Sequence, residues 1–424
     1  MLRGLVAGPL LSLVAVAPGD WPQWRGPNRD ATSEARGLPG AWPTELSERW
    51  RAHVGGGQSS PVVAGDTTFS FSREQDMEVA RALDLRTGKT LWRRGYPAPY
   101  AVYPGAASYG SGPKSTPVLD EGRLFTLGIS GILTAFDATQ GRILWQKDFA
   151  SRFKPSAPPF GTAMSPLVAN GLLVVHAGGH ERGALIAFDP ATGAEKWSLE
   201  GDGPSYSSPI LTSFSGELQP VIQVHRRILG VDPGSGRILW SLPFVTPCDQ
   251  NIVTPLRAGE VVVVSSVDTG TQGIRVTREG THWRAGVAWH TPDVSMYMSS
   301  PVLVNGRVIG LSHRRQGEYF ALDPATGAVV WRSEPRQGQN AAFVVAEGAV
   351  LVLQGDGTLL VLPKEASGFA PRRRYRVAEG ATYAHPIPTR FGILLKDENT
   401  LSLHDTGSAG AASGGRADGD EHGQ

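Results

Sequence analysis

Aspartates recur at a regular position in this 424-residue sequence and are the first side chains that could do chemistry. A carboxylate could act as a general base, and a nearby tryptophan could stack on a planar ligand or a nucleotide base. Because the same combination returns five times, we interpret it as structural. The aspartate accepts hydrogen bonds from turn amides, and the tryptophan packs between neighbouring units. The pairs, each eight residues apart, are Asp84 and Trp92, Asp137 and Trp145, Asp189 and Trp197, Asp232 and Trp240, and Asp323 and Trp331.

Other reactive side chains are few. Cys248 is the single cysteine, which excludes an internal disulfide and any metal site built from several cysteines. His176, His180 and Glu181 could suggest a metal ligand set. We expect His180 and Glu181 on an exposed hairpin, however, and predict no metal site. The sequence contains neither a Gly-x-Ser-x-Gly nucleophile elbow nor a CxxCH haem motif, so we assign no catalytic residue.

A longer repeat organises these residues. Each unit begins with Ser or Thr followed by Pro and an apolar strand, and the composition of 53 Gly and 32 Pro is typical of many tight turns. Intervals of 42 to 56 residues suit a four-stranded blade of a β-propeller. The unit starts are Ser60-Pro61, Thr116-Pro117, Ser165-Pro166, Ser208-Pro209, Thr254-Pro255, Ser300-Pro301, the variant Ala342-Phe343 and His385-Pro386.

These starts predict an all-β fold, an eight-bladed propeller with four-stranded antiparallel blades. Blade five has lost its aspartate, and we assign Trp283 as its packing residue. Blade eight lacks a final strand, whereas residues 48–54 read as a strand that belongs to no other blade. We therefore predict that this N-terminal strand closes the last blade and hides both open edges of the ring. Seven blades remain the alternative if the weak seventh unit is an insertion.

The first and last strands of the repeat set the bounds of the predicted domains. Residues 1–17 resemble a signal peptide, 18–45 form a Pro- and Gly-rich N-terminal coil docked on the ring, 46–405 form the propeller, and 406–424 form a disordered tail. The signal predicts a periplasmic or secreted protein, and no segment is long and apolar enough to span a membrane. With 40 basic and 39 acidic residues, the charge argues against nucleic acid as a partner. We expect a monomer.

The unit Ala-(Phe/Leu)-Asp-x-x-Thr-Gly-x-x-x-Trp resembles the repeat of the pyrroloquinoline-quinone-like (PQQ-like) β-propellers. The segment Trp21-Pro22-Gln23-Trp24-Arg25-Gly26-Pro27-Asn28 resembles the N-terminal part of many secreted members. The resemblance covers about residues 20 to 405. It implies the propeller fold, and the family includes quinoprotein dehydrogenases and BamB-type outer-membrane assembly lipoproteins. The alcohol dehydrogenases in this family typically stack their quinone on a disulfide between adjacent cysteines, beside calcium. Cys248 alone cannot form that disulfide.

Propellers place ligand groups on the loops that lead into the innermost strands, at the mouth of the central channel. We therefore predict a ligand-binding site for a polar small molecule or an extended peptide on these loops; an ordinary solvated channel lining is the alternative. The candidate residues are Lys114, Ser115, Asp249, Gln250, Asn251, Tyr297, Asn340 and His385.

The sequence favours a non-catalytic binding or scaffold module whose partner is an envelope protein, a peptide or a small polar molecule, with no cofactor. The alternative is a PQQ- and calcium-dependent oxidoreductase acting on alcohols or sugars, for which Asp249 is the candidate loop carboxylate. A third hypothesis is a structural module within an envelope complex, which would expose apolar residues on one blade edge or face.

Overall fold

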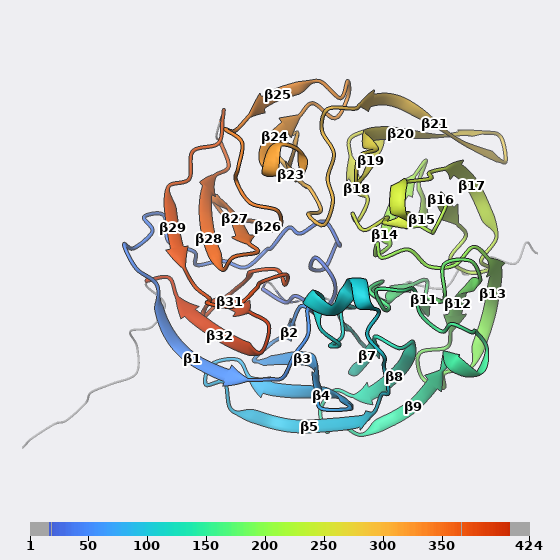
Figure 1. Ribbon diagram of the computed structural model, residues 1–424, viewed down its shortest axis with the longest axis horizontal. Helices are drawn as coiled ribbons and strands as arrows, with labels where there is room; N and C mark the ends of the chain where they lie inside the picture. The colour runs from blue at the N-terminus through green and yellow to red at the C-terminus, as the bar shows by residue number, and fades with distance from the viewer. Residues whose placement is uncertain (1–16, 18, 366, 408–424) are drawn as a thin grey trace, which may run out of the picture.

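The computed structural model describes residues 17, 19–365 and 367–407. Within these residues the strands form eight four-stranded sheets, arranged as blades around a central axis (Figure 1). All pairings inside the blades are antiparallel, as in β2 (Val62–Ala64) with β3 (Thr67–Glu74) and β3 with β4 (Met77–Asp84). The predicted eight-bladed propeller is thereby confirmed and the seven-bladed alternative is excluded. The predicted signal peptide and tail lie almost wholly outside the described residues and stay predictions.

Each blade runs from an innermost strand at the channel to an outermost strand at the rim. The innermost strands are β2 (Val62–Ala64), β6 (Val118–Asp120), β10 (Leu167–Ala169), β14 (Ile210–Phe214), β18 (Leu256–Ala258), β22 (Val302–Val304), β26 (Ala341–Ala346) and β30 (Ile387–Thr389). The second strands are β3 (Thr67–Glu74), β7 (Arg123–Leu127), β11 (Leu172–Gly178), β15 (Glu217–Gln223), β19 (Val261–Ser266), β23 (Arg307–Ser312), β27 (Ala349–Gln354) and β31 (Gly392–Lys396).

The outer halves of the blades follow the same order. The third strands are β4 (Met77–Asp84), β8 (Ile132–Asp137), β12 (Gly183–Phe188), β16 (Arg227–Val231), β20 (Gly270–Glu279), β24 (Glu318–Leu322), β28 (Thr358–Pro363) and β32 (Thr400–Asp405). The rim strands are β5 (Thr90–Pro97), β9 (Ile143–Asp148), β13 (Glu195–Gly201), β17 (Ile238–Pro243), β21 (His282–Thr291), β25 (Val329–Arg332), β29 (Arg373–Arg376) and β1 (Ser47–His53). Short 3₁₀ helices lie in the connections: η1 (Pro104–Tyr109), η2 (Phe149–Ser151), η3 (Pro247–Asp249) and η4 (Arg314–Gln316).

Strand β1 closes the ring. It pairs antiparallel with β32, from Ser47 opposite Asp405 to His53 opposite Thr400, so blade eight has the order β1-β32-β31-β30. In Figure 1 the blue β1 lies beside the red β32. Closure pairs the edge of β32 that would otherwise present free backbone groups. The predicted closure by an N-terminal strand is confirmed.

The repeated aspartates cap turns between the third strands and the rim strands. Asp189 Oδ1 accepts the backbone N–H groups of Ala191 and Thr192, both at 3.0 Å. The Thr192 N–H lowers the pKa of the Asp189 carboxyl, because it stabilises the charged form. Gly193 completes the turn at φ +69°, a conformation that a side chain disfavours. Asp84, Asp137, Asp232 and Asp323 accept turn amides in the same way.

The repeated tryptophans join one blade to the next. The indole N–H of Trp145, in blade two, donates to the carbonyl oxygen of Pro190 in blade three at 3.0 Å. Its ring lies over Gly193, where a Cβ would come within 2.7 Å of the ring. A glycine is therefore required at this turn for two reasons, its positive φ and the closeness of the indole. The same interblade hydrogen bond joins Trp50 to Leu85, Trp92 to Ala138, Trp197 to Pro233, and Trp289 to Pro324.

Blade five differs from the sequence prediction. Trp289, and not Trp283, packs against the next blade, and it lies opposite Gly273 in the β20–β21 pair. Trp283 lies near the tip of this long hairpin, opposite Arg278, whose guanidinium is 5.2 Å from the ring. The loss of the aspartate turn also affects blade four, because Trp240 has no such turn to cover. Its indole N–H donates to Gln219 at 2.9 Å inside its own blade.

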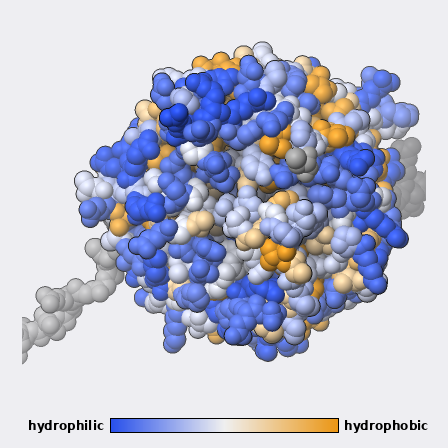
Figure 2. All heavy atoms as spheres, viewed as in Figure 1, coloured by the Kyte–Doolittle hydropathy of each residue, from blue (hydrophilic) through white to orange (hydrophobic). Residues whose placement is uncertain are grey.

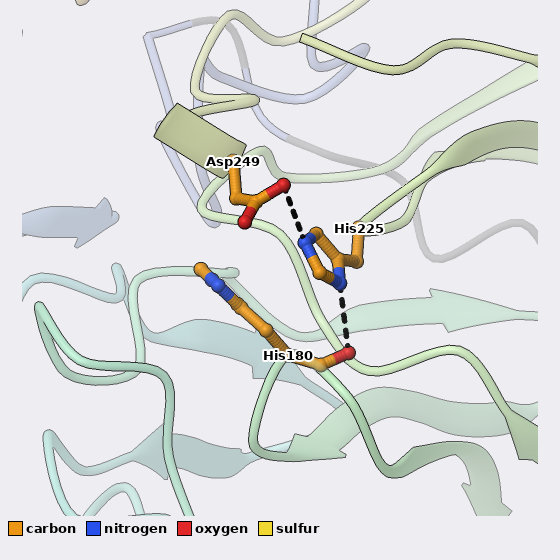
Figure 3. Close-up of side chains that lie close together, drawn as sticks. All are labelled: His180, His225 and Asp249. Carbon is orange, nitrogen blue, oxygen red and sulfur yellow. Dashed lines mark hydrogen bonds and ion pairs between the residues drawn. The ribbon is translucent and has the colours of Figure 1, made fainter. Parts of the chain in front are cut away.

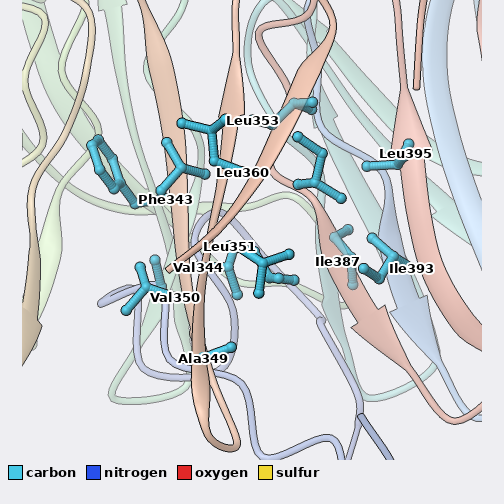
Figure 4. Close-up of a cluster of buried hydrophobic side chains, with 14 of the residues drawn as sticks. Phe343, Val344, Ala349, Val350, Leu351, Leu353, Leu360, Ile387, Ile393 and Leu395 are labelled. Carbon is cyan, nitrogen blue, oxygen red and sulfur yellow. The ribbon is translucent and has the colours of Figure 1, made fainter. Parts of the chain in front are cut away.

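The sequence of blade seven contains no tryptophan, and its described residues form no aspartate-capped turn between β28 and β29; apolar packing takes their place. Phe343, Leu351 and Leu360 belong to the same buried cluster as Ile387 and Ile393 of blade eight (Figure 4). Each fully buried side chain of this size stabilises the fold by roughly 1.5–3 kcal/mol. The weakest repeat in the sequence is thus an ordinary blade with an apolar interface.

Candidate functional site

The N-terminal coil enters the central channel, where Figure 1 shows a blue segment crossing the middle of the ring. Its Arg25 and Arg29 are fully buried there. Arg29 donates to the backbone oxygens of Pro166 and Pro209, at 2.9 and 2.6 Å, and Arg25 donates to that of Pro301. Burial lowers the pKa of Arg29 to about 9, which leaves the guanidinium charged at neutral pH. The coil therefore ties blades three, four and six together from inside the ring.

At four of the blade starts, the opening Ser or Thr is linked to that of the next blade around the channel. In this position a backbone N–H of one blade donates to the hydroxyl of the following blade. These bonds run from Ser60 to Thr116 at 3.2 Å, from Thr116 to Ser165 at 3.0 Å, from Ser165 to Ser208 at 2.9 Å, and from Thr254 to Ser300 at 2.9 Å. The repeated hydroxyls thus have a structural role, which leaves the loops before them to form the site.

Above this ring of hydroxyls the channel opens into a funnel of about 130 Å³. Trp24 forms part of its floor; the indole N–H donates to Thr254 Oγ1 at 2.9 Å, and the ring meets His385 edge-on at 4.7 Å. On this side of the molecule, pale and apolar residues are visible near the centre of the face, with hydrophilic ones predominating at its margin (Figure 2). The aromatic lining of the funnel comprises Trp24, Tyr109, Phe160, Tyr206, Tyr297 and Tyr383.

The funnel is one of several hollows on this face. A cavity of about 410 Å³ lies toward blades one and eight and shares Gln58, Tyr109 and Tyr383 with the funnel. Another of about 550 Å³ lies along blades six and seven, lined by Asn340 and again by Tyr383. The hollows therefore adjoin one another at Tyr383 and together form an interrupted groove.

Lys114 supplies a positive charge to the funnel. Its ammonium group donates to the Phe160 carbonyl oxygen at 2.7 Å and lies 5.3 Å from the centre of the Tyr109 ring. Burial lowers its pKa to about 8. It takes part in none of the ion pairs found among the described residues. A partly dehydrated cation beside aromatic rings favours a ligand with a carboxylate or a carbonyl oxygen.

Several of the predicted site residues lie at this mouth. Lys114, Gln250 and Tyr297 line the funnel itself. Asn340 and His385 line a small adjoining hollow of about 30 Å³. Burial, and secondarily the charge of Arg25, lower the pKa of His385 to about 3, so its imidazole is neutral at physiological pH.

Three predicted residues lie elsewhere. Asn251 is fully buried, and its amide bonds to the carbonyl oxygen of His225 at 3.0 Å and to the Thr246 hydroxyl at 2.9 Å. Ser115 is also fully buried, so neither residue is presented to a ligand in the funnel. Asp249 turns to one side and pairs with His225 Nε2 at 2.8 Å. A position just before a Ser/Thr-Pro start therefore does not determine whether the side chain points into the funnel.

Sequence reasoning missed most of the aromatic lining. Trp24 was assigned to a docked coil without a place in the channel, and Tyr109, Phe160 and Tyr206 were not singled out. They stand in the long connections between blades, and the polar loop residues were chosen instead. An aromatic residue in a Gly- and Pro-rich connection was the available signal, since such a side chain needs an apolar surface to cover.

The funnel does not fit a quinone–calcium centre. Calcium takes six to eight oxygen ligands, mostly from carboxylates and carbonyl groups. Among the described residues, the lining of the funnel includes neither Asp nor Glu. Asp249, the loop carboxylate considered for that chemistry, is instead paired with a histidine. Among the described residues that line the funnel, Lys114 therefore has no carboxylate beside it.

Comparisons with known proteins agree with the fold. Residues 75–314 and 287–368 match the PQQ_2 family, described as "Outer membrane protein assembly factor BamB". The outer membrane protein assembly factor BamB of Yersinia pestis is 23% identical over 339 residues, which covers 76% of this chain and 68% of that protein. No helix among the described residues has the length and apolar character needed to cross a bilayer.

Two solved structures share the architecture. BamB from Moraxella catarrhalis superposes with a TM-score of 0.61 at 16% identity, covering 85% of this chain and 99% of that one. The quinohemoprotein alcohol dehydrogenase from Comamonas testosteroni superposes with a TM-score of 0.66 at 14% identity, covering 97% of this chain and 83% of that one. At these identities the likeness concerns the fold alone.

Proposed function

Because the chain belongs to the PQQ_2 family of BamB-like propellers, we propose that it is a non-catalytic binding module of the cell envelope. Its ligand is an extended segment of a partner polypeptide, held on the face where the channel opens. A periplasmic location and a place in outer-membrane protein assembly are parts of this proposal. They are supported by the description of the family and by the name of the Yersinia pestis relative.

The proposal rests on the groove formed by the three hollows that adjoin at Tyr383. Hollows of about 410 and 550 Å³ adjoin the narrow funnel, one toward blades one and eight and the other along blades six and seven, and all three share this tyrosine. A compact cofactor would fill one enclosed pocket, whereas an extended peptide can place successive side chains in successive hollows. Aromatic walls supply apolar contact area at a low cost in conformational entropy, and Lys114 can pair with a carboxylate of the ligand.

Site-specific photo-crosslinking tests this proposal. A benzophenone amino acid replaces Tyr297 in the funnel, and in a control variant it replaces Leu91, which is 56% exposed on the rim strand β5. We expect the full-length Tyr297 variant, expressed in the source cells, to form a discrete adduct with an envelope polypeptide, and the Leu91 variant to form none. Equal labelling from both positions, or adducts from Leu91 alone, would contradict a binding site at the funnel.

Calorimetry separates this function from the oxidoreductase alternative. Purified full-length protein is titrated with pyrroloquinoline quinone, with and without Ca²⁺. We expect no saturable heat, because the funnel lacks the carboxylates that calcium needs and offers a single lysine to a tricarboxylate. Calcium-dependent binding at micromolar affinity or tighter would overturn the assignment as a non-catalytic module.

A further inference from the structure

Beside the funnel, three loops bring together two histidines and an aspartate (Figure 3). His180 lies in the β11–β12 hairpin of blade three, His225 in the β15–β16 hairpin of blade four, and Asp249 ends helix η3 before blade five. One ligand atom from each residue lies within 4.8 Å of the others. The side chain of His225 is buried, and that of Asp249 is 45% exposed. From the sequence alone, His180 is considered together with His176 and Glu181, and no metal site is predicted.

The hydrogen bonds fix which nitrogen of His225 is available. Its Nδ1 lies 3.0 Å from the carbonyl oxygen of His180, and a carbonyl oxygen can only accept, so Nδ1 carries the hydrogen. In the neutral ring the lone pair is therefore on Nε2. That nitrogen lies 2.8 Å from Asp249 Oδ1, so two electron-rich atoms face each other. A cation at this point, either a proton on the ring or a metal ion, removes the repulsion.

His180 distinguishes these two cations. Its Nε2 is buried and has no hydrogen-bond partner among the described residues, and its ring stacks on that of His225 with centroids 4.6 Å apart. A proton shared between His225 and Asp249 leaves the His180 nitrogen unsatisfied. A metal ion satisfies all three groups at once.

We propose that His180, His225 and Asp249 form a binding site for a transition-metal ion of the zinc class. Two imidazole nitrogens and one carboxylate oxygen are a common ligand set for Zn²⁺, with bonds of about 2.0–2.2 Å and a fourth position left open. Ligand atoms of a tetrahedral ion are about 3.3 Å apart at those bond lengths. The three ligand atoms now lie within 4.8 Å of one another, so they would have to move closer together to hold the ion. Nitrogen donors disfavour Ca²⁺ and Mg²⁺.

Hydrogen bonds from neighbouring residues hold the histidines of the proposed site in place. The carbonyl oxygen that orients His225 also accepts the Gly203 N–H at 3.0 Å, which holds the blade-three hairpin in place. The amide of Asn251 donates to the backbone oxygen of His225 at 3.0 Å, which gives this buried residue a positioning role. Such outer hydrogen bonds set the tautomer and the orientation of metal-binding histidines. Tyr206, which lines the funnel, meets the His180 ring at 5.2 Å, so the site adjoins the funnel wall.

Zinc titration of untagged, chelator-treated, full-length protein tests the proposal. We expect one Zn²⁺ per chain at sub-micromolar affinity, together with the visible absorption of four-coordinate Co²⁺ when cobalt is used instead. His180→Gln and Asp249→Asn each weaken zinc binding at least ~10-fold and abolish the cobalt spectrum. His282→Gln, which changes an exposed histidine on another blade, leaves both unchanged. These two variants alter partly exposed side chains, and a thermal melt of each verifies that it folds.

Two outcomes overturn the metal site. One is the absence of saturable zinc binding to the wild-type chain. The other is zinc binding that His180→Gln and Asp249→Asn leave intact, because the ion is then held elsewhere and the trio is an ordinary histidine–aspartate pair. Neither outcome depends on the proposed envelope function, since the titration uses no partner polypeptide.

Discussion

Replacing Gly193 by alanine tests how the blades are joined, and Gly171 offers a matched control in the same blade. Both glycines have nearly the same backbone conformation, at φ +69° and +70°. A Cβ on Gly193 would come 2.7 Å from the Trp145 ring, whereas a Cβ on Gly171 would meet nothing within 4 Å. Both substitutions therefore carry the same cost of placing an alanine in a left-handed backbone conformation. Only Gly193→Ala also disturbs the contact between blades.

The magnitudes follow from these contacts. A left-handed conformation costs an alanine about 1–2 kcal/mol, and this is the whole effect expected for Gly171→Ala. Carbon atoms pack best at about 3.5–4.0 Å, so Gly193→Ala must displace the indole by roughly an ångström. Overpacking of this kind costs about 1–3 kcal/mol. The displacement also stretches the 3.0 Å hydrogen bond from Trp145 to Pro190, which is worth about 1 kcal/mol. We expect Gly193→Ala to destabilise by about 2–4 kcal/mol more than Gly171→Ala.

Urea unfolding followed by circular dichroism measures both variants, and a third experiment isolates the contact. In a Trp145→Ala background, Gly193→Ala should cost no more than Gly171→Ala, because the ring that it displaces is gone. Equal losses of stability from the two glycine variants in the wild-type background would refute the reasoning. Blade joining would then rest on the apolar interfaces and the channel hydroxyls alone.

Two further predictions concern the channel. Lys114 should titrate near pH 8 by lysine ¹³C NMR, against about 10.4 for a free lysine, because burial disfavours its charged form; a midpoint above pH 10 would mean that the funnel is open to solvent. Arg29→Met should lower the free energy of unfolding by about 3–5 kcal/mol, because it leaves buried carbonyl oxygens without a donor, whereas Arg36→Met on the exposed part of the same coil should change it by less than about 0.5 kcal/mol. Similar urea midpoints for the two arginine variants would show that the coil does not hold the blades together.

The number of blades and the closure of the ring could be predicted because both depend on local, repeated chemistry. An aspartate capping a turn and a tryptophan eight residues later leave a recognisable trace whatever surrounds them, as at Asp189 and Trp197. Blade five was harder because its hairpin is longer, with ten residues in each of β20 and β21. The added length moves the packing tryptophan to position 289. This tryptophan is identified by its position opposite Gly273 in the pairing of the two strands.

The site was less predictable because it depends on directions that a one-dimensional pattern does not contain. Asn251 and Gln250 are adjacent in the sequence, yet one is buried between loops and the other lines the funnel. His180, His225 and Asp249 meet only because neighbouring blades bring their loops together, at separations of 45 and 24 residues. The arginines of the coil illustrate the same limit, since nothing local marks Arg29 as the donor to carbonyl oxygens of two blades.

The pairing of β1 with β32 has a consequence for biosynthesis. The ribosome makes β1 first, but its partner strand ends at Asp405, so more than 300 residues must be added before the two can meet. The N-terminal coil cannot complete its hydrogen bonds early either, because the carbonyl oxygens that accept from its arginines include that of Pro301. Until then the nascent chain carries an unpaired strand edge and an unfilled channel, both targets for chaperones and proteases. A truncation that removes β32 should therefore disable the whole ring, because β1 then has no strand to pair with.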